Sequence, residues 1–207
     1  MVIRAIQWVK AHKAALATAA FIILLGAGLG AAFVVQMRDN KNRGWQILSN
    51  GQYVAMQGQA PEAHRYFSEL EAQYNRNEIG DFGLLWHATL YAREGNWTQA
   101  IERYQALLNR QKVKPILPLA TMGLARAYDA TGARDKAIEE FQKFLSLYAD
   151  HFATPQAYEG LARLHESKGE KDKTKEYLER LRVLYPDSVW AVRATTKLRL
   201  LAQEDNR

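Results

Sequence analysis

The stretch LATMGLARAYDATGARDKAIEEFQKFLSLYA, Leu119–Ala149, decides the fold. Its apolar residues recur at spacings of three and four on either side of Gly132, which is typical of two amphipathic helices. Glycine readily adopts the left-handed conformation that ends many helices, so Gly132 is expected to form the turn between them. Two antiparallel helices cannot bury both of their apolar faces alone. We therefore expect this hairpin to stack on similar hairpins.

The same pattern occurs four times at a constant interval of 37 residues. The turn glycines are Gly58, Gly95, Gly132 and Gly169. Seven positions before them stand the small residues Gly51, Ala88, Ala125 and Ala162, and nine positions after them stand the large residues Phe67, Tyr104, Phe141 and Leu178. Small residues let two backbones approach, and large apolar residues fill a helix face. This register predicts an all-α solenoid of about four repeats.

The spacing of Ala125, Tyr128, Gly132, Ala137 and Phe141 resembles the tetratricopeptide repeat. The resemblance covers about residues 44–187 and implies a right-handed solenoid of helical hairpins, whose first helices line a concave groove that binds peptides. Residues 188–207 are expected to supply a capping helix and a short tail.

The repeat departs from that family in its length, because the usual period is about 34 residues. We expect the extra residues at the joints between hairpins, in stretches such as Lys112–Pro118 and Ala149–Pro155. The first copy is the weakest, with Asn50 and Gly51 where a large residue and a small one are expected.

Residues 14–37 contain no charged side chain and are bounded by Lys13 and Arg38. This run exceeds the roughly 20 apolar residues that span a hydrocarbon core, so it predicts a transmembrane helix in contact with the lipid bilayer. A cleaved signal peptide is the alternative, with Gly30-Ala31-Ala32 as the cleavage site. An apolar region of about 7–15 residues is usual for such a signal, and here the run is longer, which favours an uncleaved anchor.

The orientation of this helix rests on the size of the domain that follows it. Three Lys or Arg residues stand on each side of the segment, so the positive-inside rule does not decide. A short tail (1–13) before the segment and a large domain (44–187) after it favour a cytoplasmic N-terminus. A basic juxtamembrane linker (38–43) joins the two parts. The predicted location is a bacterial inner membrane, with the repeats in the periplasm.

Gly26 and Gly30 form a Gly-x-x-x-Gly pair within the predicted membrane helix. This spacing lets two membrane helices approach closely and indicates a possible homo-oligomer. Glycine is also simply common in membrane helices, which is the alternative explanation.

The charge distribution argues against nucleic-acid binding. The net charge is +6, but residues 1–43 carry +5 of it and the remaining 164 residues carry only +1. The excess therefore flanks the membrane segment, where it can meet anionic lipid headgroups. The repeat part lacks the strongly basic balance of a nucleic-acid-binding domain.

Catalytic motifs are not found in the sequence. His165-Glu166 begins like a zinc-protease helix, but Gly169 stands where the second histidine is required. His165 shares its repeat position with Tyr91 and Tyr128, so we expect it to pack in the core. No catalytic residue, metal site or cofactor is predicted, and the chain is not expected to be an enzyme.

The candidate binding residues lie on the first helices of the hairpins, off their packing positions. They are Gln52, Met56, Leu85, Trp86, Thr89, Arg93, Met122, Arg126, Asp129, Glu159, Arg163 and Glu166. Arg126 and Arg163 are 37 residues apart and can bind carboxylates or carbonyls. The alternative is that these arginines pair with Asp129, Glu159 and Glu166.

The lysine and asparagine clamp by which some chaperone-binding relatives hold a C-terminal carboxylate is absent. Leu48, Gln52 and Trp86 occupy its first positions.

The layout of the whole chain is similar to the YfgM-type ancillary subunits of the SecYEG translocon. That resemblance implies a membrane-anchored scaffold whose periplasmic groove binds proteins or peptides during translocation or envelope chaperoning. Two alternatives stay open. One is an assembly factor for an envelope machine such as a pilus, secretion or division complex, and the other is a self-associating structural array.

Overall fold

The computed structural model describes the backbone of residues 12–205, and the side chains of all of these except 14–17, 19, 20 and 205. The predicted tail of residues 1–13 lies almost wholly outside this range. The chain divides into two compact units, with the boundary between Gln46 and Ile47. Each unit is described by itself.

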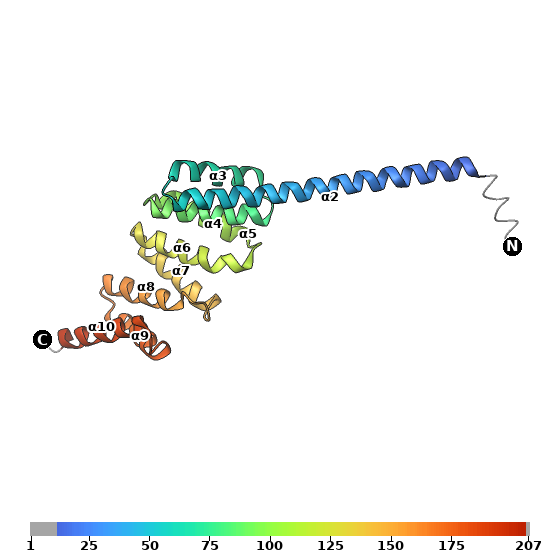
Figure 1. Ribbon diagram of the computed structural model, residues 1–207. Coiled ribbons are helices and arrows are strands. Elements are labelled where there is room, and N and C mark those ends of the chain that lie inside the picture. The colour runs from blue at the N-terminus through green and yellow to red at the C-terminus, as the bar shows by residue number, and fades with distance from the viewer. Residues whose placement is uncertain (1–11, 206–207) are drawn as a thin grey trace, which may run out of the picture. The chain divides into compact units, whose positions relative to one another are not determined.

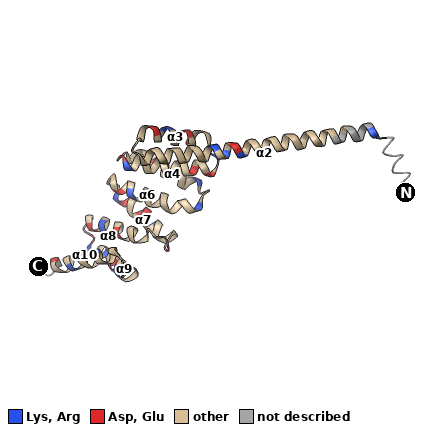
Figure 2. Ribbon diagram, viewed as in Figure 1, with Lys and Arg blue, Asp and Glu red and all other residues tan. Residues whose placement is uncertain are grey.

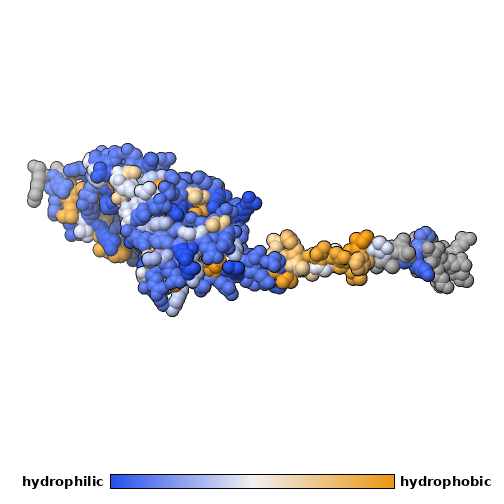
Figure 3. Space-filling model, turned by 90° about the horizontal axis from the view of Figure 1, so that it is seen from above, coloured by the Kyte–Doolittle hydropathy of each residue, from blue (hydrophilic) through white to orange (hydrophobic). Residues whose placement is uncertain are grey.

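The first unit consists mainly of helix α2 (Lys13–Met56), whose last ten residues belong to the second unit. Its apolar side chains are exposed, as Phe21 at 63% and Leu24 at 71% illustrate. The segment Phe21–Met56 contains an 18-residue window with a mean hydropathy of 1.8, so it is long and apolar enough to cross a membrane, a test that signal sequences also pass. Figure 3 shows the hydrophobic residues along this part of the helix.

Helix α2 continues without interruption through residues 38–43, the predicted linker. Figure 2 shows charged residues here, next to a long uncharged stretch of the same helix. Nothing lies within 4 Å of a Cβ atom built on Gly26 or Gly30. The glycine pair is therefore open to contact from another helix.

The second unit is a stack of helical hairpins followed by one more helix (Figure 1). The hairpins pair the end of α2 with α3 (Ala60–Gln73), α4 (Glu78–Arg93) with α5 (Trp97–Arg110), α6 (Leu117–Ala130) with α7 (Arg134–Leu147), and α8 (Thr154–Ser167) with α9 (Lys171–Leu184). Helix α10 (Val189–Asp205) packs on α9, and the described residues contain no strand. The predicted all-α hairpin solenoid is confirmed.

The four repeat glycines form the hairpin turns, as their spacing predicts. Their φ angles lie between +75° and +78°, in the left-handed region. In each turn the glycine N–H donates to a carbonyl three residues back, for example from Gly132 to Asp129 at 3.0 Å. This arrangement satisfies carbonyls at the helix end that would otherwise lack partners.

The joints between hairpins hold the extra residues only in part. The short 3₁₀ helix η1 (Lys114–Ile116) lies in the joint before α6. Proline stands in the first turn of both α6 and α8, where its missing N–H costs nothing. Before α4 the joint is shorter, because α4 has 16 residues where α6 and α8 have 14. The side chain of Asn77 caps α4 by accepting from the Ile79 N–H at 3.0 Å.

The repeated small and large residues pack in the core of the second unit. The small residues Ala88, Ala125 and Ala162 and the large residues Phe67, Tyr104, Phe141 and Leu178 are all buried. His165 is also buried, and its Nδ1 lies 2.7 Å from the Glu170 carboxylate, so the prediction that it packs in the core is confirmed.

Helix α10 covers the last hairpin, as expected of a capping helix. Ala191, Ala194 and Leu201 are buried, and the last two pack with apolar residues of α8 and α9. Its outward side is partly apolar, because Val192 and Leu200 are exposed.

Candidate protein-binding groove

The largest of the described surface cavities lies between the first helices of the second and third hairpins. It has a volume of about 620 Å³, and its lining extends to the start of α8. Its lining residues are Phe82, Leu85, Trp86, Thr89, Tyr104, Ile116, Leu119, Met122, Gly123, Arg126, Phe152, Ala153 and Gln156. We call this cavity the α4–α6 pocket. Its volume is within the range of roughly 300–1,000 Å³ that is usual for ligand sites.

A glycine creates much of the space in the α4–α6 pocket. Trp86 and Gly123 occupy equivalent positions one repeat apart, so only the earlier helix carries a side chain there. A Cβ atom at Gly123 would lie 2.4 Å from the Cζ atom of Tyr104. The bare backbone of α6 therefore lets the Tyr104 ring reach the pocket.

Tyr104 supplies a polar atom to the otherwise apolar wall. Its hydroxyl lies 3.3 Å from the Thr89 hydroxyl, and burial raises the pKa of the phenol. The phenol therefore stays protonated at neutral pH and can donate a hydrogen bond.

The floor of the pocket is buried and its rim is exposed. Leu85 and Met122 form part of the floor, whereas Leu119 and Phe152 stand at the rim. The Phe152 side chain is 74% exposed although it is large and aromatic. Exposed apolar residues around an apolar depression mark a surface suited to protein contacts.

Among the described residues, Arg126 is the only charged one that lines the α4–α6 pocket. Its guanidinium donates to the side-chain amide oxygen of Gln156, which is neutral. Within residues 12–205 no carboxylate lies at ion-pair distance from Arg126. The pocket therefore presents a positive charge beside apolar walls.

A second, smaller pocket of about 270 Å³ lies between α8 and α10. Here the charges are paired: Arg193 lies 3.3 Å from Glu159, and Lys197 lies 2.5 Å from Glu166. Arg163 at its edge forms an ion pair with Asp129 of the preceding hairpin. The hydrogen bond from Arg163 to Asp129 raises the pKa of the guanidinium. The charged side chains of this smaller pocket therefore already neutralise one another.

The structure distributes the predicted groove residues over several places. Five of them line the α4–α6 pocket, namely Leu85, Trp86, Thr89, Met122 and Arg126. Glu159, Arg163 and Glu166 line the smaller pocket, and Asp129 pairs with Arg163. Gln52, Met56 and Arg93 line neither. The predicted alternative of pairing with Asp129, Glu159 and Glu166 applies to Arg163, and it does not apply to Arg126.

Sequence reasoning missed eight lining residues: Phe82, Tyr104, Ile116, Leu119, Gly123, Phe152, Ala153 and Gln156. Phe82, Leu119 and Gln156 share one repeat position, at an interval of 37 residues, so the register contained the signal. Phe152 lies in a joint, outside the helices from which the candidates were drawn. Among the described residues, no group of three His, Asp or Glu side chains is placed to hold a metal ion.

Comparison with known protein families and solved structures identifies the same type of helical repeat. A tetratricopeptide repeat family model matches residues 83–111, 120–151 and 156–188. No curated protein sequence matches the chain. A crystal structure of MamA is 21% identical with a TM-score of 0.64, and the match covers 79% of this chain and 82% of that one.

Two further structures have the same fold. A tetratricopeptide repeat protein from Parabacteroides merdae is 20% identical with a TM-score of 0.64, covering 79% of this chain and 60% of that one. MamA from Desulfovibrio magneticus is 18% identical with a TM-score of 0.60, covering 70% and 78%. At these identities the likeness concerns the fold alone. Between residues 83 and 188, the chain therefore carries three consecutive tetratricopeptide repeats.

Proposed function

We propose that the chain is a membrane-anchored interaction scaffold whose α4–α6 pocket binds an exposed segment of a partner protein. The observation that carries this proposal is the unpaired Arg126 guanidinium beside an apolar cavity of about 620 Å³. A cation that is not neutralised within its own protein favours a ligand that brings a negative charge.

The pocket also defines the chemistry of the partner. A bulky apolar side chain fits against Leu85, Met122 and the exposed ring of Phe152. A carboxylate on a neighbouring residue of the partner then reaches Arg126. Methionine and aromatic walls adapt to different apolar side chains, which suits a scaffold with several clients.

The N-terminal segment supports a membrane location for this scaffold. We assign residues 14–37 to the inner membrane, with the N-terminus in the cytoplasm and the repeats in the periplasm. Confinement at a membrane raises the effective concentration of a weak binder near membrane partners. A role beside the translocon or the envelope chaperones follows from the similar layout of the YfgM-type subunits.

Peptide display on the full-length chain in mild detergent tests the proposed chemistry. We expect selected peptides to combine a bulky apolar residue with Asp or Glu within two positions of it. The same selection on Arg126→Ala should keep the apolar preference and lose the acidic one. Arg163→Ala is the matched control, because its arginine is already paired, and it should keep both preferences.

A selection that enriches no common sequence from the wild-type chain would refute the groove. The same acidic preference in Arg126→Ala would instead place the charge recognition elsewhere. In cells, a photo-crosslinking amino acid at Trp86 should give discrete adducts that are absent when it is placed at the exposed Lys143 of α7. If translocon and chaperone subunits are not among those adducts, the assembly-factor alternative becomes the better one.

A further inference from the structure

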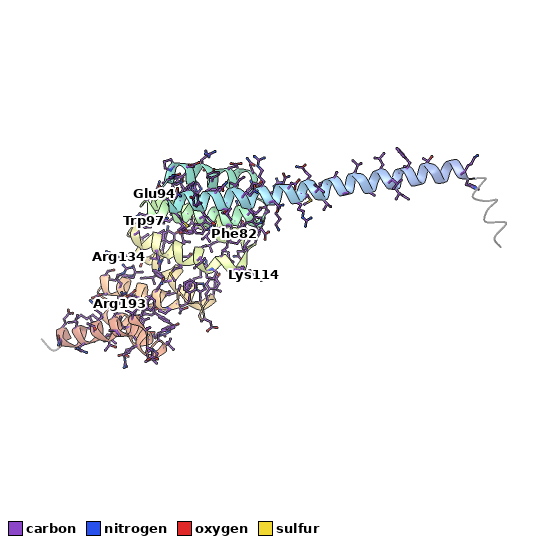
Figure 4. The ribbon with its side chains drawn as sticks, in the orientation of Figure 1. Phe82, Glu94, Trp97, Lys114, Arg134 and Arg193 are labelled. Carbon is purple, nitrogen blue, oxygen red and sulfur yellow. The ribbon has the colours of Figure 1, made fainter. Side chains whose placement is uncertain are left out.

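The two ends of the hairpins form two different edges of the second unit. In each hairpin the first helix begins, and the second helix ends, at a joint, whereas the turn glycine lies at the opposite ends of these helices. We call the edge formed by the joints the joint edge, and the edge formed by the turns the turn edge. Figure 4 shows Lys114 of a joint on one side of the stack, and Trp97 and Arg134, which follow turns, on the other.

Most of the large apolar side chains that are exposed in this unit lie at the joint edge. Two of them, Leu119 and Phe152, belong to the rim of the α4–α6 pocket. The joint-edge residues outside that pocket, which are 54–65% exposed, are Leu147 and Leu184 at the ends of α7 and α9, Val183 before Leu184, and Val189 at the start of α10. A group of exposed apolar side chains of this kind marks a surface suited to contacts.

Two of these side chains occupy the same repeat position. Leu147 and Leu184 are 37 residues apart, and Arg110 holds this position in the second hairpin. There Arg110 Nη1 lies 3.1 Å from Oδ1 of the buried Asp81. In the third and fourth hairpins proline stands in place of that aspartate, and the leucine at the helix end is exposed. The ion pair of the second hairpin is thus replaced twice by an exposed apolar side chain.

The charges beside this apolar surface do not make it basic. Near Leu184, Arg182 Nη2 lies 2.7 Å from Glu179 Oε2, so these two charges neutralise each other. The later joints also carry one aspartate each, Asp150 and Asp187. Attraction to anionic groups therefore does not explain a contact at this part of the edge, and burial of apolar area does.

The chain enters the second unit at the joint edge. The part of α2 that belongs to this unit begins at Ile47 and ends at Met56, just before the first turn glycine, Gly58. Ile47 follows Met37, the last residue of the uncharged run, by ten positions. Ten residues span at most about 35 Å when fully extended. Because the proposed function places residues 14–37 in the bilayer, the chain holds the start of this edge within that distance of the lipid.

We propose that the joint edge of the repeats lies on the surface of the membrane that holds α2, with Leu147, Leu184 and their apolar neighbours among the lipid headgroups. This proposal rests on the membrane anchor of the proposed function. The anchor keeps the lipid at a high effective concentration, so a contact of small area is sufficient. Since Leu119 and Phe152 lie at the same edge, the α4–α6 pocket would then receive a partner segment close to the bilayer.

Single cysteines test this contact, because the chain contains none of its own. The full-length chain is reconstituted in vesicles of phosphatidylethanolamine and phosphatidylglycerol, with a nitroxide spin label at one position at a time. Relaxation by oxygen, which concentrates in lipid, is compared with relaxation by a water-soluble nickel complex. We expect the oxygen-to-nickel ratio at Leu147→Cys and Leu184→Cys to be severalfold higher than at Met56→Cys. Met56 is the matched control, because it is apolar and exposed but stands at the turn edge.

A label at Leu25→Cys reports on the anchor and separates the two proposals. If this label is not in lipid, the membrane anchor itself is refuted. If it is in lipid while Leu147 and Leu184 give the ratio of Met56, the anchor stands and the contact of the joint edge is refuted.

Two further outcomes identify a different occupant of the joint edge, and each overturns the proposal. Labels shielded from both oxygen and nickel, with dipolar broadening that grows with the protein-to-lipid ratio, would assign the edge to a second copy of the chain. A high ratio that is lost when phosphatidylcholine replaces phosphatidylglycerol would show an attraction of charges in place of an apolar contact. The proposed contact requires that the ratio stay high in the neutral lipid.

Discussion

Arg126 and Arg163 occupy equivalent positions one repeat apart, yet only Arg163 has a carboxylate partner within residues 12–205. Asp129 neutralises Arg163 across the joint between two hairpins. One repeat before Asp129, where a partner for Arg126 would stand, the residue is Ala92. The presence of one acidic residue therefore distinguishes Arg163, which is held in an ion pair, from Arg126, which is not.

This difference predicts unequal effects of two otherwise identical substitutions. Arg126→Ala should weaken the binding of an acidic, apolar peptide by about tenfold to a hundredfold, because a hydrogen bond to a charged group contributes about 1.5–3 kcal/mol. Arg163→Ala should change the affinity by less than about twofold, and its exposed ion pair should contribute at most about 1 kcal/mol to stability. Calorimetric titration and thermal unfolding measure both quantities. Equal losses of affinity would show that the pairing with Asp129 does not distinguish the two sites.

Substitutions of Phe152 and Phe144 should distinguish an effect on peptide binding from an effect on folding stability. Phe152→Ala should weaken peptide binding but change the free energy of unfolding by less than about 0.5 kcal/mol, because the ring is exposed. Phe144→Ala removes a fully buried ring and should cost about 3–5 kcal/mol. Urea unfolding provides the comparison. A large stability loss in Phe152→Ala would mean that the ring supports the joint rather than the pocket.

The turn glycines are expected to resist substitution for reasons of backbone conformation alone. Gly132 has φ +76°, and nothing lies within 4 Å of a Cβ atom placed on it. Gly132→Val should therefore lower stability by about 1–2 kcal/mol or more through strain, and Gly132→Asn by less, because asparagine tolerates the left-handed region. Thermal unfolding distinguishes the two. Equal losses would point to a steric cause that the structure does not contain.

Acid pH should weaken the last hairpin through Glu170. Hydrogen bonds from Lys173 and from His165 lower the pKa of Glu170 to about 2, from 4.5. A carboxylate with a lowered pKa stabilises the fold above its unfolded pKa, and this contribution is lost as the pH falls from about 5 towards 2. Glu170→Gln should therefore flatten the decrease in melting temperature over this range. Parallel curves for variant and wild type would exclude Glu170 as a source of acid sensitivity.

The proposed topology predicts a clear protection pattern in bacterial cells. Protease added to spheroplasts should digest the repeats, and protease added to intact cells should not. A cytoplasmic marker protein must stay intact in both samples as the control. Full protection of the repeats in spheroplasts would reverse the orientation of α2.

The sequence predicted the features that repeat and missed those that depend on single exceptions. The positions of the four turn glycines follow from their interval, and all four adopt the left-handed conformation that this position requires. The hydrogen bond between His64 and His87 was not predicted, because the two residues show no ligand spacing and meet only when two hairpins stack. Comparison of repeat positions contained a signal, since His87 stands where Leu124 and Leu161 fill the core. The pairing of Arg163 with Asp129 was one of two alternatives that the sequence left open, because a periodic pattern does not specify side-chain directions across a joint.

The contacts of the second unit run mainly between helices that follow one another in the chain. Such an array opens from its free ends, because a terminal helix has a neighbour on one side only. The α4–α6 pocket is lined by the second and third of four hairpins and by the start of the fourth. Fraying must therefore pass through the first hairpin from one end, or through α10 and α9 from the other, before it reaches the site. The position of the pocket in the array thus insulates binding from the least stable parts of the solenoid.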